Sequence, residues 1–280
     1  MVKRNPSFKI ESVEGRKSVR VSELDRCGRS LQFESLGYQK DAEKYEAVLG
    51  RLKHLLFELY LRVDPTVYES FYLKKMHKIV EVCLPDDAWR LKKDLLEVEA
   101  KIKVFLLSKS GKKLLLNKSI IDIEDPVRIP VEQLGLNIRQ PLEIQKKYCL
   151  SGRPDFKLMN QIFEIKPGKE VKKRQKIQAY AYQVMLDIAE PQIKHGNKYV
   201  LLGGEKIKID RNPFLSRIIW NPKQDLADKI SGQIDIFERI GKNEGLLDPK
   251  RDYQDCQFCR YFTACNTIKR PRTEWRRIKK

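Results

Sequence analysis

Two acidic side chains and a lysine lie in segment 151–168, SGRPDFKLMNQIFEIKPG, among residues that are typical of buried strands. If residues 159–160 form a two-residue hairpin turn, Asp155 lies opposite Glu164, and strand alternation puts Lys166 on the same face. Directly opposed residues bring their Cβ atoms within about 5 Å. Two carboxylates that close repel each other unless a cation lies between them, and a hard divalent ion such as Mg²⁺ or Mn²⁺ suits oxygen ligands. The segment therefore predicts a metal site with Lys166 beside it, where an ammonium could orient a water or stabilise a phosphate.

The opposite face of this hairpin is predicted to be hydrophobic core, and it carries Phe156, Leu158, Phe163 and Ile165. The arrangement depends on register, because a slip by one residue would move the two acids onto opposite faces. A single D…ExK pattern is also typical of a surface salt-bridge cluster. The metal site therefore needs support from residues elsewhere in the chain.

A histidine and a pair of helical polar residues extend the predicted site. Gly50 precedes His54 by four residues in a helical pattern, and helical side chains lean towards the N-terminus. Gly50 would therefore leave the space above His54 open for a metal near DNA; the alternative is a packed or solvated histidine. Gln178 and Tyr182 share one face of a later helix. They could contact a base, a phosphate or Lys166, or be simple polar positions.

The balance of charge predicts a polyanionic partner. The 280 residues include 57 Lys and Arg against 38 Asp and Glu, which gives a net charge of +19. Nucleic acid is the usual partner of such a chain. Five basic residues around the start of the helix expected at 170–189 could follow a DNA backbone or form a solvated face; they are Lys169, Lys172, Lys173, Arg174 and Lys176.

The N-terminal residues and the cysteines predict a reducing compartment. Residues 1–12 lack the apolar run of a secretory signal, and no stretch has the apolar length needed to span a bilayer. A cytoplasmic protein without a membrane partner is therefore expected, in which cysteines are metal ligands or core residues rather than disulfides.

The six cysteines divide into a cluster and isolated residues. Three of them form a C-x2-C-x5-C pattern, and a fourth lies alone near the start of the chain; these are Cys256, Cys259, Cys265 and Cys27. From spacing alone, a four-cysteine zinc site and an iron–sulfur cluster fit equally well. Cys83 and Cys149 fall outside the pattern and are predicted to be core.

The apolar pattern predicts an α/β fold, in which helices pack on a mixed β-sheet. Helices are expected at 39–63, 68–82, 86–107, 170–189 and 223–241. β structure is expected at 113–131, 144–150, 153–158, 161–166, 198–204 and 216–220. We expect one domain over 1–268, followed by a basic tail at 269–280. Within the domain we expect a helical part at about 31–107, a β insertion at about 110–140 and a catalytic core at about 143–210. The cysteine region comprises 256–265 together with Cys27.

Four motifs together resemble those of the RecB-like branch of the PD-(D/E)xK nucleases. That family has, in this order, a G-x-x-x-H helix, a G-R-x-D strand, an E-x-K strand and a Q-x-x-x-Y helix. In this chain the corresponding segments are 50–54, GRPD at 152–155, EIK at 164–166 and QAYAY at 178–182. Each motif is weak alone, but all four occur in order over most of the chain. The resemblance implies a restriction-endonuclease-like core.

One early and three late cysteines around this core resemble the iron–sulfur RecB-like exonucleases, whose stand-alone form is the fourth CRISPR-associated (Cas) protein family. The resemblance implies a [4Fe–4S] cluster that ties the chain ends together, held by Cys27, Cys256, Cys259 and Cys265. It also implies Mg²⁺ or Mn²⁺ bound by His54, Asp155, Glu164 and the carbonyl of Ile165. Lys166 would position or deprotonate the attacking water, while Gln178 and Tyr182 would hold Lys166 and the substrate.

The implied activity is exonucleolytic hydrolysis of single-stranded DNA or overhangs, acting from 5′ ends. Such an enzyme trims new spacers in CRISPR adaptation, with Cas integrase subunits as partners. The sequence has no G-x-x-x-x-G-K-[ST] loop, so a motor is not expected. Two alternatives stay open: a RecB-like repair or viral exonuclease, and a non-catalytic iron–sulfur DNA-binding protein. Intact Asp155, Glu164 and Lys166 favour an enzyme.

Overall fold

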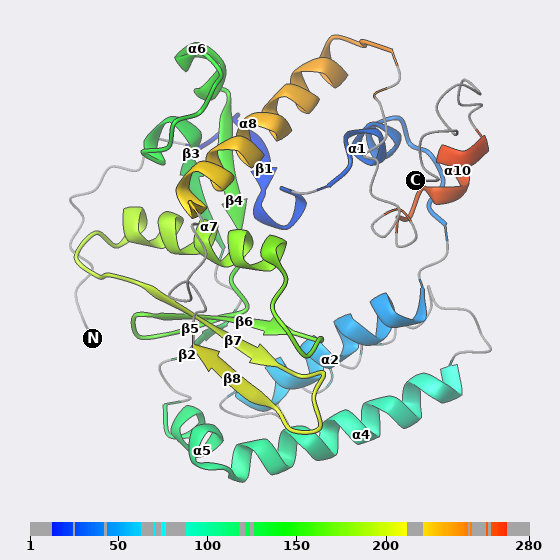
Figure 1. Ribbon diagram of the computed structural model, residues 1–280, viewed down its shortest axis with the longest axis vertical. Coiled ribbons are helices and arrows are strands. Elements are labelled where there is room, and N and C mark those ends of the chain that lie inside the picture. The colour runs from blue at the N-terminus through cyan, green and yellow to red at the C-terminus, as the bar shows by residue number, and fades with distance from the viewer. Residues whose placement is uncertain are drawn as a thin grey trace.

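The computed structural model has an α/β architecture with two mixed sheets flanked by helices (Figure 1). It describes residues 13–24, 26–41, 44–62, 70, 74, 76, 88–117, 121–123, 126–211, 221–245, 247, 256 and 259–267. The helices are α1 (Gly28–Ser35), α2 (Tyr45–Leu61), α4 (Ala88–Leu107), α5 (Lys109–Leu115), α6 (Leu142–Gln145), α7 (Lys173–Ala189), α8 (Pro222–Gly241) and α10 (Phe262–Thr267). The strands are β1 (Lys17–Arg20), β2 (Ile121–Ile123), β3 (Val127–Pro130), β4 (Tyr148–Gly152), β5 (Phe156–Leu158), β6 (Gln161–Lys166), β7 (Gly196–Leu201) and β8 (Lys208–Arg211).

The larger sheet has the strand order β2-β5-β6-β7-β8, in which β6 and β7 are parallel and the other neighbours antiparallel. Strands β5 and β6 form the predicted hairpin. The pairs Phe156↔Phe163 and Leu158↔Gln161 confirm its register, with a two-residue turn between them. The left-handed residue of that turn is Met159, with φ 53°, rather than Asn160.

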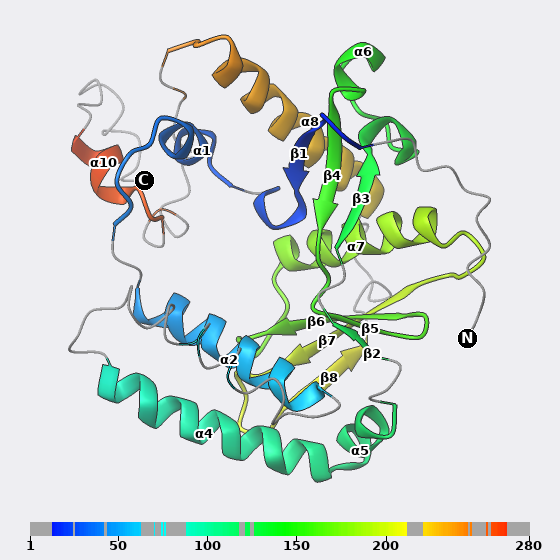
Figure 2. The ribbon, with the colours of Figure 1, turned by 180° about the vertical axis from the view of Figure 1, so that it is seen from behind.

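One face of the larger sheet packs on helices α2, α4 and α5 (Figure 2). The strands contribute all four predicted core residues of the hairpin to this cluster, and the helices contribute residues such as Phe57, Ile102 and Leu114. The rings of Phe156 and Phe163 stack with their centroids 4.5 Å apart. Since neighbouring residues of a strand point to opposite faces, Glu164 and Lys166 must lie on the other face, towards α7.

Helix α7 lies between the two sheets (Figures 1 and 2). The smaller sheet has the order β1-β4-β3, with β1 parallel and β3 antiparallel to β4. Its core cluster includes Leu150 of β4, Ile177 of α7, Ile230 of α8 and Ile162 of β6. One side of α7 faces this cluster, because Ile177 and Ala181 are buried in it and Val184 and Ile188 pack against it.

Two predictions of β structure are wrong. KLLLN at 113–117 was expected to be a strand, but residues 109–115 form helix α5. The Ser108 side chain caps this helix by accepting a hydrogen bond from the Gly111 N–H. The three consecutive leucines hid its periodicity, since Leu114 is buried while Leu116 is 86% exposed. The strand expected from residue 144 begins at Tyr148, because α6 follows Pro141.

Strands β2 and β3 lie within the β insertion expected at about 110–140, and they are edge strands of the larger and the smaller sheet respectively. The helix expected at 68–82, the strand expected at 216–220, Cys83 and the basic tail lie largely or wholly outside the described residues. No helix in the described part of the chain has both the length and the apolar character required to span a bilayer.

Candidate functional site

Helix α2 places a histidine and an acid on one side of the candidate site. His54 and Glu58 are four residues apart, so they lie on one face of the helix. Glu58 is fully buried, and its Oε1 lies 2.6 Å from Nε2 of His54. The sequence prediction missed Glu58, although the H-x-x-x-E spacing in a strongly apolar helix was a usable signal.

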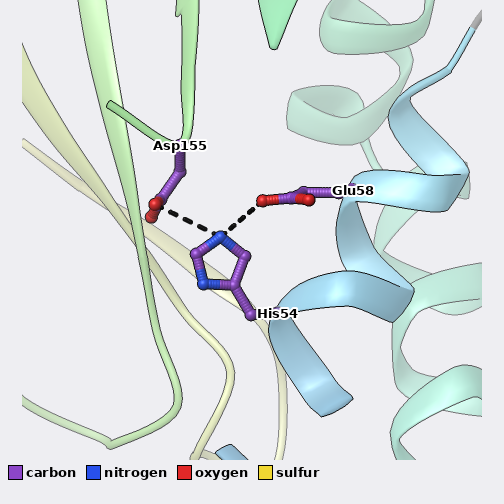
Figure 3. Close-up of side chains that lie close together, drawn as sticks. All are labelled: His54, Glu58 and Asp155. Atoms are coloured by element: carbon purple, nitrogen blue, oxygen red, sulfur yellow. Dashed lines mark ion pairs between the residues drawn. The ribbon is translucent and has the colours of Figure 1, made fainter. Parts of the chain in front are cut away.

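The β5–β6 hairpin supplies the second acid. Asp155 directly precedes β5, and its Oδ2 accepts a hydrogen bond from the Ile165 N–H of β6. Its Oδ1 lies 3.2 Å from Nε2 of His54, so that the three side chains point towards one another (Figure 3). Ile165 was predicted to offer its carbonyl to a metal; here it orients Asp155 through its N–H.

Two carboxylate oxygens thus converge on one imidazole nitrogen. That nitrogen carries at most one hydrogen and cannot donate a full hydrogen bond to both oxygens. Ligand atoms of His54, Glu58 and Asp155 all lie within 4.8 Å of one another. Because carboxylate oxygens and imidazole are ligands for divalent metals, the residues fit the Mg²⁺ or Mn²⁺ that the resemblance implies.

Glu164 lies beside this group rather than within it. It is fully buried, and its Oε2 accepts a hydrogen bond of 2.8 Å from Nζ of Lys166. Among the described residues, no hydrogen-bond donor reaches the other oxygen, Oε1. Glu164 was predicted to be a metal ligand together with His54 and Asp155. Its ion pair with Lys166 leaves one carboxylate oxygen available for that role.

The electrostatics of the site reflect an excess of buried acids. Burial and the negative charge of Asp155 raise the pKa of Glu164 to about 7, although Lys166 opposes them. Burial by itself lowers the pKa of His54, but Asp155 and Glu58 outweigh it and hold that pKa well above its ordinary value. Burial raises the pKa of Asp155, but the positive charges of His54 and Lys166 produce a net lowering. A divalent cation would relieve the repulsion between these carboxylates.

Helix α7 brings Gln178 and Tyr182 to the same corner. Nε2 of Gln178 donates to Oη of Tyr182 at 3.3 Å, so in the described part of the chain Tyr182 bonds to Gln178 rather than to Lys166 as predicted. Burial, and then the negative charge of Glu164, raises the pKa of Tyr182. A Cβ on Gly152 would lie 2.4 Å from Cε1 of Tyr182. The glycine of the GRPD motif therefore allows the ring of Tyr182 to approach β4.

Gly50 lies close to the end of β6. A Cβ at this position would lie 3.4 Å from Cγ of Pro167, the residue after Lys166, which is an ordinary van der Waals distance. This part of α2 therefore runs beside the strand that carries Glu164 and Lys166. The open space expected above His54 stays a prediction.

The basic residues predicted to contact DNA follow β6 directly. Lys169, Lys172, Lys173 and Arg174 are exposed, and Lys176 is half-buried. Lys173 forms an ion pair of 2.8 Å with Asp225 of α8. This basic segment leads from Lys166 into the first turns of α7, so its charge lies next to the candidate site.

Two of the four cysteines of the predicted cluster can be placed on neighbouring helices. Cys27 precedes α1 and Cys265 belongs to α10, and these helices lie close together although they are distant in the sequence (Figures 1 and 2). Arg29 of α1 donates from Nε to the Leu247 carbonyl at 2.7 Å, and its Nη1 lies 3.9 Å from Sγ of Cys265. Asp41 adds two links, from its N–H to the Arg260 carbonyl at 2.6 Å and from Oδ2 to the Thr263 N–H at 2.9 Å.

The sulfur atoms of these cysteines are not gathered as in a closed zinc site. In the described residues, the group of potential ligands within 4.8 Å of one another is His54, Glu58 and Asp155, without a cysteine. Zinc–sulfur bonds of about 2.3 Å would place tetrahedral sulfurs about 3.8 Å apart. An iron–sulfur cluster has iron and sulfide atoms between its cysteines and so separates them further. All four cysteines are half-buried.

Cys149 lies apart from this region and is buried in β4. Burial raises the pKa of its thiol, which is consistent with the predicted core position.

Comparisons with known proteins give little further information. No protein-family model matches the chain, and no curated protein has a matching sequence. One similar solved structure is described as "Crystal structure of SSO0001". The match covers 91% of this chain and 89% of that chain, with 15% sequence identity and a TM-score of 0.41. A likeness at this level supports no conclusion about fold or function.

Proposed function

We propose that this chain is a metal-dependent deoxyribonuclease with a PD-(D/E)xK core. The observation that carries the proposal is the convergence of His54, Glu58 and Asp155, with the buried Glu164–Lys166 pair beside them. Three acids, one imidazole and one ammonium in a buried corner are costly unless they serve a ligand. The arrangement matches the residue types that metal-assisted phosphodiester hydrolysis requires.

His54, Glu58 and Asp155 would hold the divalent ion, with the free oxygen of Glu164 next to them. A bound Mg²⁺ or Mn²⁺ supplies Lewis acidity to a phosphoryl oxygen and lowers the pKa of water. Lys166, held by Glu164, places a positive charge beside the scissile phosphate and orients the attacking water. Gln178 and Tyr182, which are hydrogen-bonded to each other on α7, would bind the substrate.

The net charge of +19 and the basic segment after β6 support DNA as the substrate. Following the motif resemblance, we propose an exonuclease that acts from 5′ ends on single strands or overhangs. Its setting would be spacer trimming in CRISPR adaptation, in the cytoplasm and with Cas integrase subunits. The cysteines would hold a [4Fe–4S] cluster that fixes the two chain ends together.

The catalytic proposal is tested with end-labelled single- and double-stranded DNA, incubated with Mn²⁺ or with a chelator. The Glu164→Gln variant should lose Mn²⁺-dependent cleavage, because the ammonium of Lys166 loses its charged partner. It should still bind DNA, since the basic segment is unchanged. Cleavage by this variant at the wild-type rate, in a preparation free of contaminating nuclease, would contradict the proposal.

The cluster is tested separately by purifying the protein without oxygen. We expect a brown protein with about four iron and four sulfide per chain, as for a [4Fe–4S] cluster. A colourless protein with stoichiometric zinc would show that the cysteines hold a structural zinc instead.

A further inference from the structure

A buried hydrogen-bond acceptor and a buried donor lie on neighbouring strands, and each is without a partner. The acceptor is Oε1 of Glu164 on β6, and the donor is the hydroxyl of Tyr199 on β7. Both side chains are fully buried. Neither atom has a hydrogen-bond partner among the described residues. Buried polar atoms are almost always paired, so a matched donor and acceptor left over at one place need an explanation.

The register of the sheet puts these two residues side by side. Strands β6 and β7 are parallel, and Glu164 is the Cα partner of Tyr199. Partners on adjacent strands point to the same face, with the strands about 4.8 Å apart. The negative charge of Glu164 acts on the phenol: burial first, and then Glu164, raises the pKa of Tyr199. The hydroxyl therefore stays protonated and can act as a donor.

The surroundings of Tyr199 leave Glu164 as its natural acceptor. Its ring packs on the α7 face of the sheet against Ala179, a small and fully buried residue. Asp210 is its partner on β8, but that side chain is exposed to solvent. Gln178 donates to the hydroxyl oxygen of Tyr182, the other tyrosine near the acids. Tyr199 is the phenol paired with Glu164 across β6 and β7, and its hydroxyl has no partner among the described residues.

We propose that Tyr199 is a positioning residue for Glu164. Its hydroxyl donates to Oε1 of Glu164, while Oε2 keeps its hydrogen bond to Lys166. Oε1 has a second lone pair, so the bond from Tyr199 fixes the orientation in which that oxygen would meet a divalent ion. Groups that orient a ligand in this way are a regular part of metal sites. The inference rests on the proposed metal centre, and it assigns to β7 a role that the four motifs do not include.

The test uses Tyr199→Phe, which removes the hydroxyl and keeps the ring. Mn²⁺ binding to the full-length protein is measured by electron paramagnetic resonance, in the absence of DNA. We expect the dissociation constant for Mn²⁺ to rise about tenfold, as is usual when an orienting partner is removed. The melting temperature should not fall, because the lost hydroxyl has no partner among the described residues.

Tyr148→Phe is the matched control. Tyr148 of β4 is also a fully buried tyrosine, but its hydroxyl donates at 2.6 Å to Glu238 of α8, a helix that carries none of the proposed metal ligands. This variant should melt at a lower temperature and bind Mn²⁺ as the wild type does. The two variants should therefore differ in opposite ways: Tyr199→Phe in Mn²⁺ affinity alone, and Tyr148→Phe in melting temperature alone.

Three outcomes would count against the inference. If Tyr199→Phe binds Mn²⁺ normally while Glu164→Gln does not, the inference is wrong and the metal centre stands. If Tyr199→Phe melts earlier with unchanged Mn²⁺ affinity, the hydroxyl has a purely structural role. If the wild-type protein binds no Mn²⁺, the proposed centre and this inference both fall.

Discussion

The metal centre and the cysteine region are built from different parts of the structure. His54, Glu58 and Asp155 are carried by a helix and a hairpin whose positions are set by packing and by strand register. Cys27 and Cys265 lie at helices α1 and α10, where Arg29 and Asp41 are hydrogen-bonded to distant segments. The ligand atoms of the first site converge because packed core elements carry them. If the cysteines hold a cluster as we propose, the cluster would help to define the geometry of the second region, and the two regions should respond differently to the same kind of substitution.

The largest effect is expected for Asp155→Asn, which should change the Mn²⁺ affinity and leave the cysteine region unaffected. The amide replaces a charged ligand atom and changes the partner of the Ile165 N–H. Mn²⁺ affinity should fall by more than about a hundredfold, beyond the loss typical of residues that only orient a ligand. Iron content should be unchanged. Mn²⁺ titration and iron analysis of the same sample measure both quantities.

The control for Asp155→Asn is Asp228→Asn, the same change at an exposed position of α8. It should leave Mn²⁺ affinity as it is. Equal affinities of the two variants would mean that Asp155 is not a ligand.

Cys259→Ser should give the reverse pattern. Loss of a cluster ligand removes a link between distant chain segments, and cross-links of long loops contribute about 2–5 kcal/mol to the free energy of unfolding. Denaturant unfolding should show a decrease of this size, together with loss of iron. Mn²⁺ affinity should stay within about twofold of the wild type, because distant and separate sites behave independently. A large loss of Mn²⁺ binding would show that the two regions are coupled.

Gly152→Ala should have a smaller effect on the free energy of unfolding, through packing on the metal-centre side of the molecule. The new Cβ would lie 2.4 Å from Cε1 of Tyr182 and 3.1 Å from Cγ2 of Val21, so the ring must move. Overpacking of this kind lowers the free energy of unfolding by about 1–3 kcal/mol. Gly232→Ala in α8 is the matched control, since its Cβ meets no atom within 4 Å. The control should be stabilised by about 1 kcal/mol, and destabilisation of both variants would contradict the packing argument.

The parts of the fold that follow from short-range rules could be predicted from the sequence. The two-residue turn fixed the register of β5 and β6, and that register put Asp155 next to Glu164. Helices α2, α7 and α8 lie where the apolar spacing predicted them, although α2 begins at Tyr45 and α7 at Lys173. These elements have one hydrophobic face, which is the property that periodicity detects.

The remaining features depend on contacts between distant segments. Strand β1 and helix α1 had no predicted counterpart, because β1 is defined by its pairing with β4. Glu58 looked like an ordinary polar residue of a helix until α2 was placed against Asp155. The role proposed for Tyr199 likewise depends on the parallel pairing of β6 and β7, which no local pattern specifies. The centre therefore extends beyond the expected catalytic core at 143–210, since α2 contributes two of its three converging ligands.

Strand β6 is hydrogen-bonded on both sides, by β5 and by β7, whereas the histidine and Glu58 come from a helix in a different layer. A shift of that helix by a fraction of an ångström would change the distances between the side chains of His54, Glu58 and Asp155 without disturbing the sheet. If these residues bind a divalent ion as proposed, the affinity for the ion would depend on how closely the helix packs against the hairpin. A molecule that binds the outer surface of the helical layer and moves the helix would then change that affinity.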